Sequence, residues 1–300
     1  MGKWDNLSFD RWNPEYPHSL PYRIFKCYDN DLMGMITSFE SSKGYTYSHL
    51  TSDGAVWESK AYDYGLMKDN KSRTIKQWSD NYGEFENWLR LSWLMSLCSY
   101  FETYLACVIK ECIESDPGLL IGASHIIDGI SYKKKGISVL KQEDFDAHIR
   151  NCTKGDWQSR IAHMSKLFVS LPPSVRDSIS DLEKIRKIRN DFGHAFGRDI
   201  QDSQNYFTVT KSPISRVSVE RFNKYHKLIA KIVQEIDEYL KQKHIGNYEP
   251  LLHYHLIYDK IEGMDKGYKV VELKKSLHTD RNTAYSKDFC RGAVLYYDNL

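Results

Sequence analysis

The chain has 300 residues, of which 41% are hydrophobic and 27% are charged, so it can bury a substantial core and is not compositionally disordered. Its 42 basic and 40 acidic residues leave a net charge of only +2, which argues against nucleic-acid binding driven by overall charge and requires any basic surface to be local. Six cysteines without a C-x-x-C pair argue against a disulfide scaffold or zinc finger. Together with an N-terminus that lacks a secretory core, they predict a cytoplasmic protein.

Residues 1–83 are rich in aromatic residues, Gly, Ser and Asp. Short alternating runs begin at Gly44 and at Ala55, and such alternation is typical of β-strands. We therefore predict a mixed N-terminal segment of short strands and turns, with room for one helix.

Residues 84–115 carry apolar side chains at steps of three and four, which predicts a long helix that ends at Asp116-Pro117-Gly118. The longest stretch without a charge runs from Leu91 to Phe101, well short of the ~20 residues that cross a bilayer. We therefore expect no membrane span. The apolar positions that define this helix are Leu91, Leu94, Cys98, Phe101, Leu105, Val108 and Cys112.

Three further amphipathic helices follow, predicted at residues 156–169, 173–193 and 218–246. The connection before them, residues 116–155, begins with a short helix and continues as a basic, polar stretch. The connection at residues 198–217 is polar and contains a predicted small hairpin around Tyr206.

The predicted fold is mainly α, and helices with short to medium connections favour an antiparallel four-helix-type bundle over residues 84–246. Residues 247–300 form a small C-terminal extension. It contains a helical stretch near Leu251–Ile261 and a strand-like end that begins at Gly292.

A metal or other cofactor is not expected from the sequence. His253 and His255 would share one face of a strand, but their segment has a helical pattern and no third ligand lies nearby. The sequence also has no glycine-rich phosphate loop, no G-x-S-x-G turn and no H-E-x-x-H helix.

The informative segment is Arg189-Asn190, three further residues, and His194. It resembles the signature of HEPN ribonucleases, in which an arginine, a polar residue and a histidine occur at this spacing. The order of predicted helices is also similar, because HEPN domains are antiparallel bundles with the motif before the last long helix. Arg221 and His226 match the spacing too, but we interpret that match as chance because it lacks the polar second residue and lies in mid-helix.

The residue types suit phosphodiester chemistry. Arg189 presents a planar fork of donors that can clamp a phosphate and stabilise its growing charge. His194 can transfer a proton near neutral pH, and just past a helix end it would lie at that helix's negative pole. Asn190 can orient His194 or donate to phosphate.

Flanking residues supply further candidates. Glu102 lies within an apolar helix face, where a carboxylate needs a partner, so it is either a supporting active-site residue or a structural anchor. The basic residues Lys184, Arg186 and Lys187 either gather RNA phosphates or form a solvated helix face.

The HEPN resemblance implies a metal-independent endoribonuclease that leaves a 2′,3′-cyclic phosphate, with an active cleft built by a homodimer. It also implies a toxin or antiviral defence effector, with RNA as substrate and regulation by a partner protein or by an attached segment. Two alternatives stay open: a non-catalytic HEPN module for dimerisation or nucleotide binding, and a plain helical scaffold.

Overall fold

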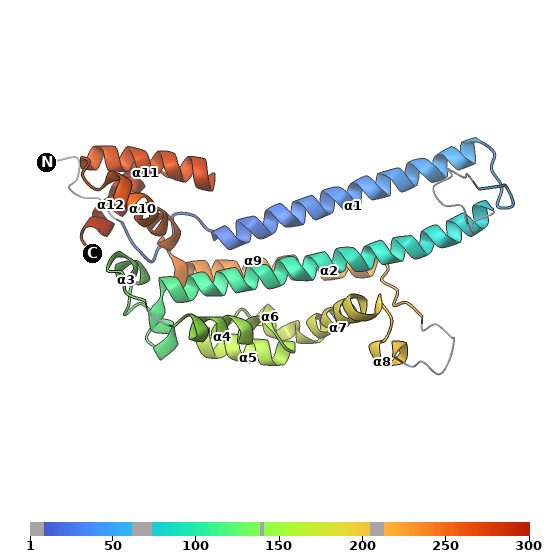
Figure 1. The fold of residues 1–300 in the computed structure, drawn as a ribbon, viewed down its shortest axis with the longest axis horizontal. Helices are drawn as coiled ribbons and strands as arrows, with labels where there is room; N and C mark the ends of the chain where they lie inside the picture. The colour runs from blue at the N-terminus through green and yellow to red at the C-terminus, as the bar shows by residue number, and fades with distance from the viewer. Residues whose placement is uncertain (1–8, 62–73, 139–140, 205–212) are drawn as a thin grey trace. The chain divides into compact units, whose positions relative to one another are not determined.

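The computed structural model describes residues 9–61, 74–138, 141–204 and 213–300. These residues are all-α, apart from one isolated bridge between Lys60 and Thr74, and among them no helix has the length and apolar character to cross a membrane. In chain order the elements in Figure 1 are α1 (Leu20–Ser52), α2 (Ile75–Ser115), the 3₁₀ helix η1 (Pro117–Ile121), α3 (Gly129–Lys134), α4 (Gln142–Thr153), α5 (Trp157–Phe168), α6 (Pro173–Asp177), α7 (Ile179–Ala195), α8 (Ile200–Ser203), α9 (Val219–Leu240), the π-helix η2 (Lys241–Ile245), α10 (Tyr248–Ile261), α11 (Lys266–Arg281) and α12 (Lys287–Asp298).

The predicted mainly α class is confirmed, but the strands predicted in residues 1–83 are wrong. The run that begins at Gly44 lies inside α1, and the run at Ala55 is a turn region. Ser and Thr residues of α1 donate their hydroxyl hydrogens to carbonyls one helical turn earlier, as Thr37 does to Met33 and Ser42 does to Ser38. These bonds satisfy polar side chains of low helix propensity without interrupting the helix.

The strand predicted at the C-terminus is also wrong, because residues from Gly292 onward lie within α12. Ser286 caps this helix by accepting a hydrogen bond from the backbone N–H of Phe289 at 3.0 Å. Gly292 is required by packing, since a Cβ atom there would lie 2.6 Å from Cβ of Phe9. The helix predicted near Leu251–Ile261 is confirmed as α10.

The predicted starts of α5, α6 and α9 are confirmed, but α2 begins at Ile75 rather than at residue 84, and the helix predicted at 173–193 is divided into α6 and α7. Asp156 accepts from the backbone N–H of Ser159 and caps α5, and Pro173 lies in the first turn of α6. The connection predicted at residues 116–155 instead contains α3 and α4. The hairpin predicted around Tyr206 falls outside the described residues.

The chain divides into two compact units. Unit 1 comprises Met1–Ile24, Glu102–Ile179 and Lys231–Leu300; unit 2 comprises Phe25–Phe101 and Ser180–Ala230. In unit 1, α10 packs against α3, α11 and α12, and α4 packs against α5.

Unit 2 is a bundle built by parts of α1, α2, α7 and α9. Aromatic rings join α1 to α2 in antiparallel order, from Tyr28 on Tyr100 with centroids 5.1 Å apart to Tyr47 on Trp78 at 5.6 Å. The ring of Phe222 in α9 lies 5.9 Å from that of Trp93 in α2.

Helix α7 completes this bundle and runs antiparallel to α2. A Cβ atom built on Gly193 would lie 3.5 Å from the methyl group of Met95, and one built on Gly197, just past α7, would lie 3.0 Å from Leu91. Asp181 near the start of α7 forms an ion pair with Lys224 of α9 at 2.8 Å. The four helices of unit 2 therefore alternate in direction along the chain.

Candidate active site on helix α7

Helix α7 has a regular apolar stripe, Leu182, Ile185 and Ile188, which is buried in unit 2. Gly197 forms the C-terminal cap of the helix. It adopts φ +82°, and its backbone N–H donates to the carbonyl of Asp191 at 3.0 Å. Of the two glycines predicted to end this helix, Gly193 lies inside it and Gly197 ends it.

The motif residues all lie within α7. Arg189 and Asn190 are half-buried, and His194 is exposed in the last turn rather than past the helix end. Side chains four apart are separated by about 40° around a helix axis, and those five apart by about 140°. Asn190 and His194 therefore share one side of α7, whereas the Cβ of Arg189 leaves the helix on another side.

A hydrogen bond connects Arg189 to Asn190. Nη1 of Arg189 donates to Oδ1 of Asn190 at 3.0 Å. Because Oδ1 accepts this bond, the amide NH₂ group of Asn190 is the end of the side chain that can donate to a phosphate. The guanidinium is therefore linked to the motif residue that shares a side of α7 with His194.

The basic residues that precede the motif are each paired within α7. Lys184 pairs with Asp181 at 2.9 Å, Arg186 with Glu183 at 2.8 Å, and Lys187 with Asp191 at 3.0 Å. Hydrogen bonding to Asp191 raises the pKa of Lys187. Exposed pairs of this kind contribute only about 0–1 kcal/mol, so a phosphate can displace their carboxylates.

Exposed aromatic rings lie beside the motif, a feature that the sequence did not single out. Phe192 of α7 contacts Trp88 of α2 edge-on at 6.1 Å, and Trp88 stacks with Phe85 at 6.3 Å with 14° between the ring planes. Phe85 and Trp88 are 46% and 42% exposed. Their faces are available to stack with bases or to pack against another protein surface.

Glu102 belongs to unit 1, whereas the motif belongs to unit 2. Its carboxylate lies 3.4 Å from the guanidinium of Arg160 and 3.5 Å from Nζ of Lys154. Arg160 also stacks over the ring of Trp157, with Cζ 4.7 Å from the ring centroid. These contacts supply the partner that a largely buried carboxylate requires, and they are those of a structural anchor.

The second sequence match, Arg221 and His226, has a different environment. Nε2 of His226 lies 2.6 Å from Oδ1 of Asp29, a carboxylate that is only 3% exposed. Burial opposes ionisation of Asp29, but hydrogen bonds from His226 and Lys26 outweigh it, so the pKa of Asp29 lies below its usual value. His226 thus stabilises the contact between α1 and α9.

We expect His226→Ala to destabilise the fold. The change removes one partner of a buried carboxylate but leaves Lys26 in place, so the free energy of unfolding should fall by about 1–3 kcal/mol. Denaturant titration measures this loss. An unchanged free energy of unfolding would contradict a stabilising role for His226.

The two histidines considered as metal ligands in the sequence contact separate partners. His253 lies 2.6 Å from the hydroxyl of Ser276, and His255 lies 2.6 Å from that of Tyr297. Burial lowers the pKa of both imidazoles. They act as packing residues of α10.

No family model, curated protein or solved structure matches the chain. A functional assignment therefore depends on Arg189, Asn190, His194 and their surroundings.

Proposed function

We propose that this chain is a metal-independent endoribonuclease that cleaves RNA through attack by the 2′-hydroxyl group. The observation that supports the proposal is the hydrogen bond from Arg189 to Asn190, which links a phosphate-binding fork to the residue that shares a side of α7 with the exposed His194. Lys184 and Lys187 add exposed positive charge to the same helix. This set combines a phosphate clamp with a proton-transferring group.

In the proposed reaction, a base removes the proton of the 2′-hydroxyl, whose oxygen forms a bond to phosphorus. The bond from phosphorus to the 5′-oxygen breaks, and an acid protonates that oxygen. The products are a 2′,3′-cyclic phosphate and a free 5′-hydroxyl. Arg189 and the amide of Asn190 stabilise the charge that grows on the non-bridging oxygens, and His194 transfers a proton.

The reaction needs both a base and an acid, whereas each motif provides one histidine. Two copies related by a two-fold axis would supply both, with His194 of one protomer opposite His194 of the partner subunit. The exposed rings of Phe85 and Trp88 next to Phe192 offer apolar surface for this contact. We therefore include a homodimer in the proposal.

We expect the protein to be a dimer at micromolar concentration, by light scattering. Trp88→Glu should shift it toward monomer and reduce cleavage, because a charge would be buried in the contact. Trp57→Glu is the matched control, since Trp57 is 54% exposed in the same unit. A wild-type monomer with full activity would refute the composite site.

Chelation provides a test of the chemistry. We expect cleavage of total RNA to persist in EDTA at temperatures where the chelated protein stays folded, because the 2′-hydroxyl nucleophile needs no metal-bound water. Products should carry 2′,3′-cyclic phosphate ends, detected by 3′-end ligation that succeeds after acid treatment followed by phosphatase but not after phosphatase alone. Cleavage that stops in EDTA and returns with Mg²⁺ would contradict this mechanism.

Because the motif resembles that of HEPN ribonucleases, we extend the proposal to a toxin or antiviral defence effector restrained by a partner protein. Expression of the wild-type chain should then arrest growth of the host cell, whereas expression of His194→Ala to the same level should not. Equal growth in the two cultures would argue against this role.

One observation favours the non-catalytic alternative. Arg189 and His194 lie in one continuous helix, where five residues separate side chains by about 140°. A dimerising or nucleotide-binding module would use Arg189 and Asn190 without proton transfer by His194. Such a module would bind RNA or nucleotides and leave RNA intact. The cleavage assay therefore distinguishes it from a ribonuclease.

A further inference from the structure

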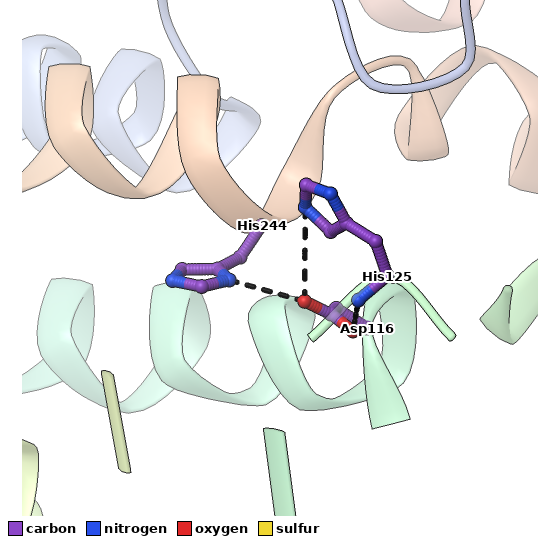
Figure 2. Close-up of side chains that lie close together, drawn as sticks. All are labelled: Asp116, His125 and His244. Atoms are coloured by element: carbon purple, nitrogen blue, oxygen red, sulfur yellow. Dashed lines mark hydrogen bonds and ion pairs between the residues drawn. The ribbon is translucent and has the colours of Figure 1, made fainter. Parts of the chain in front are cut away.

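Three potential metal ligands converge in unit 1: Asp116, His125 and His244 (Figure 2). One oxygen of Asp116 and one nitrogen of each histidine all lie within 4.8 Å of one another. Asp116 follows α2, His125 lies in the loop after η1, and His244 lies in η2. No sequence pattern marks this cluster, because its members are far apart in the chain and follow no ligand spacing.

The carboxylate of Asp116 is oriented toward both imidazoles. Its Oδ1 accepts a hydrogen bond from the backbone N–H of His125 at 2.8 Å, so Oδ2 is left for the rings. Oδ2 lies 3.1 Å from Nδ1 of His244 and 3.9 Å from Nε2 of His125 (Figure 2). A fixed outer hydrogen bond of this kind is typical of residues that hold metal-binding carboxylates in place.

The side chain of Asp116 is fully buried, and both of its oxygens accept hydrogen bonds. The hydroxyl of Ser124 donates to Oδ2, and the backbone N–H of His125 donates to Oδ1.

The ligand atoms have nearly the spacing of a tetrahedral site. Bonds of about 2.0–2.1 Å from a central Zn²⁺ place ligand atoms roughly 3.3 Å apart. The observed separations from Oδ2 are 3.1 Å and 3.9 Å, so only the ring of His125 has to move appreciably. That ring lies on a loop, and its Nε2, which lies 2.6 Å from the carbonyl of Lys243, has to give up this hydrogen bond to bind the ion.

The two imidazole rings have different surroundings. His125 adopts φ +65°, an uncommon conformation for a residue other than glycine, and its ring stacks on Trp12 with centroids 3.9 Å apart. Nε2 of His244 is buried beside Phe168 without a hydrogen-bond partner among the described residues. Nδ1 is therefore the nitrogen that His244 presents to the cluster.

We propose that Asp116, His125 and His244 bind a divalent cation of the Zn²⁺ type in unit 1. Two imidazole nitrogens and one carboxylate oxygen form a ligand set that suits Zn²⁺ better than Mg²⁺ or Ca²⁺. The hydroxyl of Ser124 donates to Oδ2 of Asp116 and lies 3.4 Å from Nδ1 of His244, so it borders the cluster. The ion joins the end of α2, the loop after η1 and η2, so its role is structural and independent of RNA cleavage on α7.

His125→Asn is the sharpest test variant. Asparagine removes the imidazole but tolerates a positive φ, and the side chain of His125 is 39% exposed, so the fold should survive. His163→Asn is the matched control, because His163 is an exposed histidine of α5 in the same unit. Both proteins are used as full chains without affinity tags.

Titration of the chelator-treated proteins with Zn²⁺ should give one saturable site per chain in wild type and in His163→Asn. In His125→Asn the affinity should fall at least about 10-fold. Saturating Zn²⁺ should raise the melting temperature of wild type by several degrees and that of His125→Asn by less. Cobalt bound by wild type should show visible absorption bands that His125→Asn lacks.

Absence of saturable Zn²⁺ binding to wild type would overturn the proposal and leave the cluster as a hydrogen-bonded anchor. Equal affinity in wild type and His125→Asn would overturn it as well. RNA cleavage by His125→Asn is expected at the wild-type rate below its melting temperature. Its loss from a folded protein would contradict a purely structural role for the ion.

Discussion

His194→Ala should slow RNA cleavage by at least ~100-fold, the usual contribution of a positioned acid or base. Arg189→Ala should slow it by about 100- to 1,000-fold, because it removes donors from the phosphate as negative charge grows in the transition state. Both proteins should remain folded, since His194 is exposed and Arg189 is half-buried. Single-turnover rates on one RNA measure both losses.

Two further variants separate the roles of these residues. Arg189→Lys keeps the positive charge but loses the planar fork, so its activity should lie between those of wild type and Arg189→Ala. His163→Ala changes an exposed histidine of unit 1 and should leave the rate unchanged. A folded His194→Ala protein with the wild-type rate would exclude proton transfer by this motif.

Arg11→Ala should lower the free energy of unfolding by about 3–5 kcal/mol, the usual cost of removing one partner from a buried ion pair. Arg11 is only 3% exposed, and its guanidinium lies 3.1 Å from Asp128. It also donates to the hydroxyl of Ser115 at 2.7 Å and to the carbonyl of Ile245 at 2.7 Å. Alanine would leave these acceptors buried without their donor.

Denaturant unfolding of the full chain measures this effect. Arg150→Ala is the matched control, since Arg150 is exposed on α4, and it should change the free energy by no more than about 0.5 kcal/mol. A similar small change for Arg11→Ala would show that the buried guanidinium contributes little to the stability of unit 1.

Helices with a clear apolar stripe were predictable from the sequence. The stripe of α2 and that of α7 follow the helical period, and the side chains of Asp156 and Ser218 accept hydrogen bonds at the starts of α5 and α9. Such local signals identify a helix because apolar periodicity and capping act over a few residues.

Helix α1 was missed because its signals conflict. Its Ser and Thr residues favour turns and strands, and its aromatic residues alternate locally. The helix is stabilised instead by tertiary contacts, in which Tyr28, Phe39 and Tyr47 pack against rings of α2. Only the pairing with α2 reveals why this stretch is helical.

The sequence supplied the residues of the candidate site but not their contacts. The spacing of Arg189, Asn190 and His194 was visible, whereas the hydrogen bond between the first two depends on side-chain conformation. The ion pair between Glu102 and Arg160 joins residues from different helices. Contacts of this kind depend on tertiary packing, which no local pattern encodes.

The most direct test of the central claim is cleavage of a defined RNA by the wild-type chain in EDTA, beside the same RNA with one 2′-deoxynucleotide at the mapped cleavage position. We expect cleavage of the all-ribose strand to a 2′,3′-cyclic phosphate. We expect no cleavage at the deoxynucleotide, because the attacking hydroxyl is absent there. Equal cleavage of the two strands, or no cleavage of either, would contradict the central claim.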